Sequence, residues 1–251
     1  MKPITKILGL AVLSMLTGNT VSLAQTSKFQ LNEASNSLPH IFGKPENSDY
    51  LYVTAGNRLY CIGNQAGQFP EVGFHVPGEM GGIWQQPVKL LDGFSLSLKN
   101  PATGLPYKSV LDSFITYSMA TKFHYLIPGE NMGITQTQFV PDNLPVLVVE
   151  YSIRNNSDAD RTYELELNTD IDLMPVWLGE KAGMTDHKDT LATFDKKRSI
   201  LYFRDKDNSW YTGIGFENDR VQFKGVKKSA YKGKGVTGTS VLSLKIASGK
   251  T

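Results

Sequence analysis

The feature that most constrains the fold is an alternating run at residues 163–173, Tyr-Glu-Leu-Glu-Leu-Asn-Thr-Asp-Ile-Asp-Leu. Successive side chains of a β-strand point to opposite faces, so the run predicts a strand with one apolar face and one polar face. The members expected to face inward are Leu165, Leu167, Ile171 and Leu173. The members expected to face solvent are Glu164, Glu166, Asn168, Asp170 and Asp172.

A second run, at residues 147–153, alternates in the same way, and a polar turn at residues 155–160 separates it from the first. Two such runs joined by a turn predict an antiparallel hairpin with one solvated face. No window has a sustained apolar period of 3.6 residues with helix caps. The other expected strands are 50–53, 58–62, 94–99, 113–117, 123–127, 134–140, 200–203, 211–217 and 240–246. Many short strands separated by turns predict an all-β fold, a large antiparallel two-sheet β-sandwich.

The N-terminus has the pattern of a signal peptide. Lys2 and Lys6 precede an apolar core at residues 7–16, and Ser-Leu-Ala at residues 22–24 supplies the small residues of a cleavage site. The apolar core is too short to span a bilayer as a helix, so no stable membrane anchor is expected. We therefore expect residues 1–24 to be a signal peptide cut after Ala24, and residues 25–251 to be one β-sandwich domain in the periplasm or outside the cell.

Composition excludes several classes of function. The 26 basic and 24 acidic residues nearly cancel, which does not favour binding to nucleic acid or to an anionic membrane. Cys61 is the single cysteine, so an internal disulfide is excluded, and its strand-like setting is typical of a packed thiol. The run Gly-Lys-Gly-Val-Thr-Gly at residues 233–238 precedes an expected strand, whereas a dinucleotide site needs a helix there. The lysines at residues 224–234 are interpreted as a solvated face.

Catalytic and metal motifs are not recognisable. The four histidines lack metal-ligand spacing, and no G-x-S-x-G sequence is present. Glycoside hydrolysis needs two carboxylates, but the pairs Glu164/Glu166 and Asp170/Asp172 lie at the i, i+2 spacing of an ordinary solvated strand face. The sequence therefore predicts no catalytic residue, no metal site and no cofactor.

One segment, residues 65–93, is rich in Gly and Pro and is expected to be a long, ordered loop. It contains an indole beside amides and charges, and a further tryptophan follows the alternating strand. The residues expected to contact carbohydrate or a partner domain are Trp84, Gln85, Gln86, Lys89, Asp92 and Trp177. Exposed aromatic rings with nearby polar groups can stack on a sugar and bond its hydroxyls. The alternative is that the tryptophans close the ends of the sandwich as core.

Two passages carry a family resemblance. Residues 75–94 read His-Val-Pro-Gly-Glu-Met-Gly-Gly-Ile-Trp-Gln-Gln-Pro-Val-Lys-Leu-Leu-Asp-Gly-Phe, and residues 170–180 read Asp-Ile-Asp-Leu-Met-Pro-Val-Trp-Leu-Gly-Glu. With the signal peptide they resemble the N-terminal part of secreted bacterial glycosidases of the glycogen-debranching or six-hairpin type.

The resemblance implies a non-catalytic β-sandwich that packs on an (α/α)6 barrel and shapes the mouth of its active site. In that group the catalytic carboxylates lie in the barrel, and the sequence to Thr251 contains no helical array, so none is carried over. The chain is accordingly interpreted as a fragment of a glycoside hydrolase acting on α-glucan-type carbohydrate, inactive by itself. The expected partners are carbohydrate and the barrel.

Two other functions remain open. The domain could be a free-standing carbohydrate-binding module in which Trp84 and Trp177 stack on sugar, or a structural envelope protein with no ligand.

Overall fold

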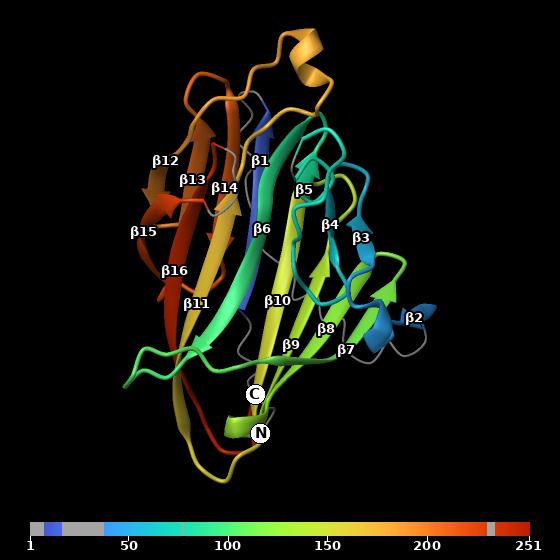
Figure 1. Cartoon of the computed structure of the whole chain (residues 1–251). Helices are drawn as coiled ribbons and strands as arrows, with labels where there is room; N and C mark the ends of the chain where they lie inside the picture. Colours follow the sequence, from blue (N-terminus) through green and yellow to red (C-terminus); the bar gives the residue numbers. More distant parts are fainter. Residues whose placement is uncertain (1–7, 17–37, 77, 230–233) are drawn as a thin grey trace.

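The computed structural model describes residues 8–16, 38–76, 78–229 and 234–251, and these form two antiparallel sheets packed face to face (Figure 1). The first sheet, sheet A, has the order β12 (Asp189–Asp195), β13 (Ile200–Asp205), β14 (Trp210–Phe216), β1 (Leu8–Leu16), β10 (Val146–Asn155), β9 (Met132–Phe139), β8 (Ala120–Ile127), β7 (Val110–Tyr117) and β2 (His40–Phe42). The second, sheet B, has the order β15 (Gln222–Lys228), β16 (Val236–Ile246), β11 (Arg161–Ile171), β6 (Val88–Lys99), β5 (Gly82–Gln85), β4 (Tyr60–Asn64) and β3 (Leu51–Ala55). Short 3-10 turns occur at Pro45–Asn47, Pro128–Glu130 and Gly179–Ala182. The predicted all-β sandwich is confirmed.

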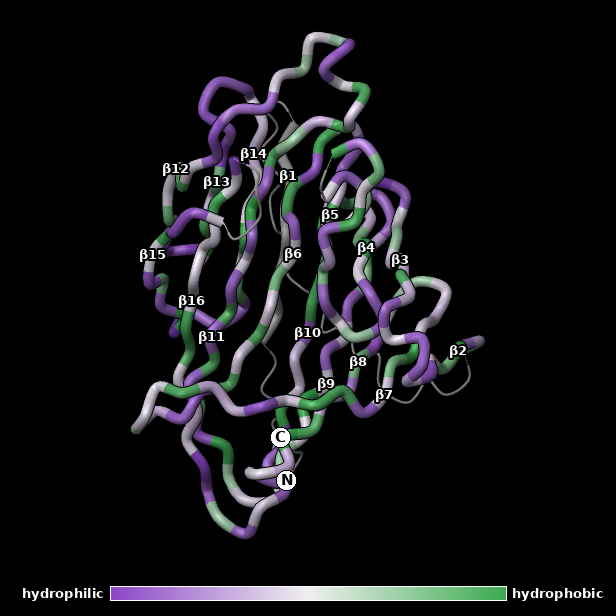
Figure 2. Tube along the Cα trace, viewed as in Figure 1, coloured by the Kyte–Doolittle hydropathy of each residue, from purple (hydrophilic) through white to green (hydrophobic). Residues whose placement is uncertain are grey.

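The core lies between the sheets and follows the predicted alternation, which Figure 2 shows as interleaved hydrophilic and hydrophobic residues along β11. The inward residues of β10 and β11 that join one buried cluster are Leu147, Val149, Tyr151, Ile153, Tyr163, Leu165, Leu167 and Ile171. The expected inward position of Leu173 is also confirmed. Of the five polar residues expected outside, four are partly exposed, but Asp172 is only 4% exposed because it lies beyond the end of β11, where the chain turns over the sandwich.

The predicted hairpin of residues 147–153 and 163–173 is wrong. β10 pairs with β9 and β1, whereas β11 pairs with β6 and β16, so the turn between them crosses from sheet A to sheet B. Buried Asn155 stabilises this crossing, because its side-chain amide donates to the carbonyls of Ala159 and Ile246 at 2.9 and 3.1 Å. Alternation predicts which face of a strand is buried. It does not predict which sheet the strand joins, because strands of both sheets bury one face and expose the other.

Residues 65–93 are less irregular than expected, because β5 and the start of β6 lie within them. Gly82 opens β5 with φ of +89°, and a Cβ at this position would collide with the carbonyl oxygen of Leu91. The strands β2, β12 and β15 were also not expected. The lysines of β15 are exposed on an edge strand, as a solvated face requires.

The segment Leu8–Leu16, which falls in the apolar core of the predicted signal peptide, forms β1 and pairs with β10 on one side and β14 on the other. The flanking residues 1–7 and 17–24, including the expected cleavage site after Ala24, lie outside the described residues. Among the described residues, no helix has the length and apolar character needed to cross a membrane.

Candidate functional site: an aromatic platform above a buried ionic cluster

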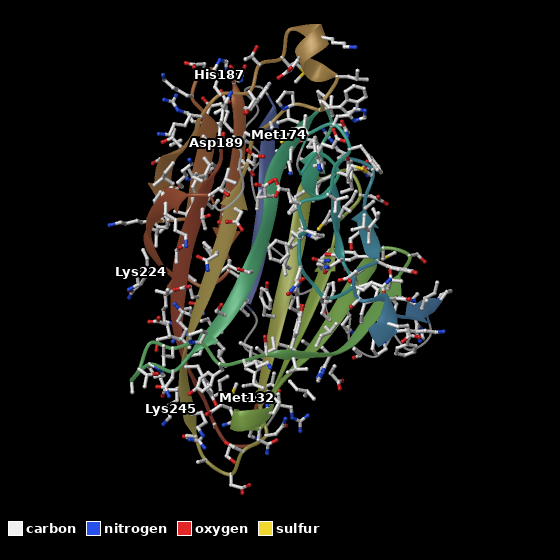
Figure 3. All side chains as sticks on the ribbon, in the orientation of Figure 1. Met132, Met174, His187, Asp189, Lys224 and Lys245 are labelled. Carbon is white, nitrogen blue, oxygen red and sulfur yellow. The ribbon has the colours of Figure 1, made fainter. Side chains whose placement is uncertain are left out.

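The two passages that carry the family resemblance meet at one end of the sandwich. After β11 ends, the chain stays beside β6: the Lys89 amide donates to the carbonyl of Met174 at 2.8 Å, and the Val176 amide donates to that of Pro87 at 2.9 Å. The segment then arches over this end (Figure 1). Figure 3 shows Met174 and Asp189 here, at the end opposite Met132. This pairing places Trp177 beside His75.

Residues 72–76 and 78–80 are arranged around the carboxylate of Glu79; we call them the Glu79 loop. One carboxylate oxygen, Oε1, accepts the backbone N–H groups of Phe74 and His75 at 2.7 and 2.9 Å, and Oε2 accepts that of Val76 at 3.2 Å. Burial alone would raise the pKa of Glu79, but these backbone donors, with the His75 ring at 3.1 Å, lower it to about 2. An ionised Glu79 therefore holds three successive residues in one conformation.

An aromatic platform stands on this loop. The His75 imidazole stacks on the indole of Trp177, with centroids 4.0 Å apart and planes 8° from parallel. Trp177 is nevertheless 43% exposed, and next to the stacked residues in sequence are Phe74, 86% exposed, and Leu178, 47% exposed. We call Phe74, His75, Trp177 and Leu178 the aromatic platform. A flat, pre-ordered aromatic surface of this kind is suited to stacking on a sugar ring or on an apolar partner.

Beneath the loop lies an ionic cluster that is shielded from solvent. The Lys89 side chain, 1% exposed, donates from Nζ to Oδ1 of Asp92 at 2.5 Å and to the Gly78 carbonyl at 2.6 Å. Its ammonium lies 5.8 Å from the centre of the Trp84 ring, and the Trp84 Nε1–H donates to the Gly81 carbonyl at 2.8 Å. A buried charge needs this degree of pairing, so the cluster ties the loop to β6.

Two further carboxyls complete the cluster. Burial, together with the nearby charges of Asp92 and Asp186, raises the pKa of Asp172 well above its usual range. Burial also raises the pKa of Asp189 to about 8, although one of its oxygens accepts the Leu173 amide at 2.8 Å. Asp172 and Asp189 are 4% and 1% exposed. Carboxyls this deeply buried cannot touch a polymeric sugar, so their chemistry here is architectural.

The six residues expected from the sequence divide between surface and interior. Trp177 and Gln86 are exposed, and Gln86 donates its amide to the Tyr60 hydroxyl at 2.5 Å. Trp84, Gln85, Lys89 and Asp92 are 9% exposed or less, which removes them from direct contact with a large ligand. Trp84 is a core residue, as the alternative interpretation of the tryptophans predicted.

The site residues expected from the sequence did not include His75, Glu79 or Leu178. The role of Glu79 does have a local signal, because its carboxylate accepts backbone N–H groups only three to five residues earlier in the chain. The stacking of His75 on Trp177 has no local signal in the sequence, because the two residues are 102 positions apart.

A separate cavity of about 620 Å³ opens between β12 and β15. Its lining includes four lysines, Lys188, Lys227, Lys228 and Lys234, but Lys234 lies 3.6 Å from a carboxylate oxygen of Asp186.

Within the described residues, no group of three or more His, Cys, Asp or Glu side chains is arranged to hold a metal ion.

Comparison with models of known protein families gave no match, and comparison with curated proteins gave none either.

Proposed function

We propose that the chain is a non-catalytic β-sandwich of a secreted glycoside hydrolase acting on α-glucan-type carbohydrate, and that it contacts the carbohydrate through the aromatic platform. The observation that carries the proposal is the parallel stack of His75 on Trp177, which is both pre-ordered and exposed. Pre-ordering matters because a ring that is already fixed loses little conformational entropy when a ligand stacks on it. The sequence resemblance supplies the class of enzyme, and in such an enzyme the platform would lie at the mouth of the catalytic barrel.

The test is binding of maltoheptaose to the full chain, measured by calorimetry, with cellohexaose as the control sugar. Trp177→Ala should weaken maltoheptaose binding about 3- to 10-fold, the range expected for one aromatic stacking contact. The matched control is Tyr211→Ala, because Tyr211 is a comparably exposed aromatic residue, at 37%, on β14. Equal affinities for Trp177→Ala and the unchanged chain would refute the carbohydrate role of the platform.

A second candidate function is favoured by the exposure of Phe74 and Leu178, which offer apolar surface without hydrogen-bonding groups. In this proposal the platform docks on the catalytic barrel and does not touch sugar. The isolated chain should then self-associate at modest concentration, and Phe74→Ser with Leu178→Ser should reduce the association in sedimentation experiments while the far-UV circular dichroism stays unchanged. A clean monomer that binds maltoheptaose through Trp177 would instead favour the carbohydrate role.

A further inference from the structure

β1 lies inside sheet A, although the sequence predicts that this segment is removed with the signal peptide. β1 is an inner strand: Leu8–Leu13 pair with residues 146–151 of β10, and Leu10–Leu16 pair with residues 210–216 of β14. The same nine residues fall in the apolar core of the leader that the sequence predicts to be removed. Removal would therefore take out a central strand and leave two long, unpaired edges facing each other.

The two edges cannot close the gap by an ordinary antiparallel pairing. β1 runs antiparallel to β10 and also antiparallel to β14, so β10 and β14 run parallel to each other. Direct contact would create a parallel pair within a sheet whose other pairings are antiparallel. It would also move one half of the sheet by a strand spacing, about 4.8 Å, against a close-packed core.

Contacts outside β1 hold the two halves of sheet A apart. On the β12 side, Asp189 accepts the Leu173 amide through its side chain and donates its own amide to the Lys234 carbonyl, which fastens β12 to segments flanking sheet B. On the β10 side, Leu147 and Val149 are fully buried in the cluster that joins both sheets. Because contacts to sheet B fix both halves, we expect the slot between them to persist when β1 is removed.

The slot also specifies what can occupy it. Residues that pair across antiparallel strands share a face, and β1 positions 8, 10 and 12 pair with Tyr151, Val149 and Leu147, all buried. On the other edge, positions 10 and 12 pair with Phe216 and Ile214, also buried. An occupant must therefore be extended and apolar at alternate positions, and it replaces the pairings of Leu8–Leu13 with β10 and of Leu10–Leu16 with β14.

We propose that the slot between β10 and β14 is a strand-acceptor site, occupied by Leu8–Leu16 before the leader is cut and afterwards by an alternating apolar strand donated by a partner polypeptide. Main-chain hydrogen bonds on both edges would supply affinity, and the alternate buried positions would supply selectivity. The proposal goes beyond carbohydrate contact, because the slot lies between two strands of sheet A, whereas the residues of the aromatic platform lie outside the strands.

The experiment uses the full chain with a specific protease site inserted between Ala24 and Gln25. After cutting, the leader fragment should co-elute with the sandwich on gel filtration. An isotopically labelled peptide of residues 7–17, made soluble by terminal lysines, should replace it over time. The same peptide with Val12→Pro should exchange at least tenfold less, because proline removes a ladder donor.

Three outcomes would overturn the proposal. The leader fragment could separate while the melting temperature and circular dichroism of the sandwich stay unchanged and the labelled peptide fails to bind. The cut protein could form a dimer that the peptide dissociates, which would make a second copy the donor. In the uncut chain, Val12→Pro could melt at the same temperature as Ile41→Pro, a matched change in the short edge strand β2, although a central strand should lose far more.

Discussion

The aromatic platform and the buried ionic cluster occupy the same end of the sandwich but use charge in opposite ways. Above, Glu79 is held ionised by three backbone N–H groups, and its order exposes two aromatic rings to solvent. Below, burial and neighbouring carboxylates raise the pKa values of Asp172 and Asp189. At this end of the sandwich the charged and carboxyl side chains therefore stabilise the fold, and the aromatic rings form the surface that a ligand can reach.

The largest expected effect is on the support. Lys89→Met should lower the free energy of unfolding by about 3–5 kcal/mol, because it leaves the Asp92 carboxylate buried without its cation. The matched control is Lys99→Met, which breaks an ion pair of the same 2.5 Å length to Glu166 but with both side chains 21% exposed. That change should lower stability by about 1 kcal/mol or less. Urea denaturation of the two variants decides the matter, and equal losses would contradict the role given to burial.

The next effect is the pH dependence of stability. A carboxyl whose pKa is raised from 3.8 to about 8, as for Asp189, binds its proton more tightly in the folded state. Stability from this group is therefore complete below pH 3.8 and falls as pH rises towards 8, by at most about 1.4 kcal/mol per pH unit. Urea midpoints at pH 5, 6, 7 and 8 should decline. In Asp189→Asn the decline should be shallower, and an unchanged slope would show that another group carries it.

A smaller, local effect is expected at Glu79, with the opposite sign. Its pKa is lowered from 4.5 to about 2, so its contribution is present above pH 4.5 and is lost as pH falls towards 2. Across that window the indole N–H resonance of Trp177 should shift in NMR spectra, because the loop beneath His75 loosens. Glu79→Gln should show the loosened position at every pH. A Trp177 resonance that is constant down to pH 2 would break the link between Glu79 and the stack.

The smallest effect on stability is expected for the platform itself. Trp177→Ala should lower the free energy of unfolding by about 0.5 kcal/mol, because the ring is 43% exposed. Trp84→Ala should lower it by about 3–5 kcal/mol, because Trp84 is buried in the core. Thermal melts of the two variants test this contrast between residues of the same type. Similar losses would mean that Trp177 is part of the architecture and would weaken the proposed function.

The sequence predicted the site in part. Residues 75–94 and 170–180 were singled out as the two passages that carry the family resemblance. They lie close together, because the chain after β11 is hydrogen-bonded to β6 and to the residue before it. Within them, however, Trp84 and Lys89 were predicted as contacts and are interior. An indole beside polar residues has the same sequence pattern whether the polar residues face solvent or surround a buried ammonium.

By itself, the sequence determined that the chain is all-β and which face of β11 is buried, because alternation is a local property with a period of two residues. Only the tertiary structure decided that β10 and β11 belong to different sheets, that Asp172 is buried, and that His75 meets Trp177. These outcomes depend on which strands become neighbours. Strand neighbours are chosen by the summed packing and hydrogen bonding of the whole sandwich, and no single window of sequence contains that sum.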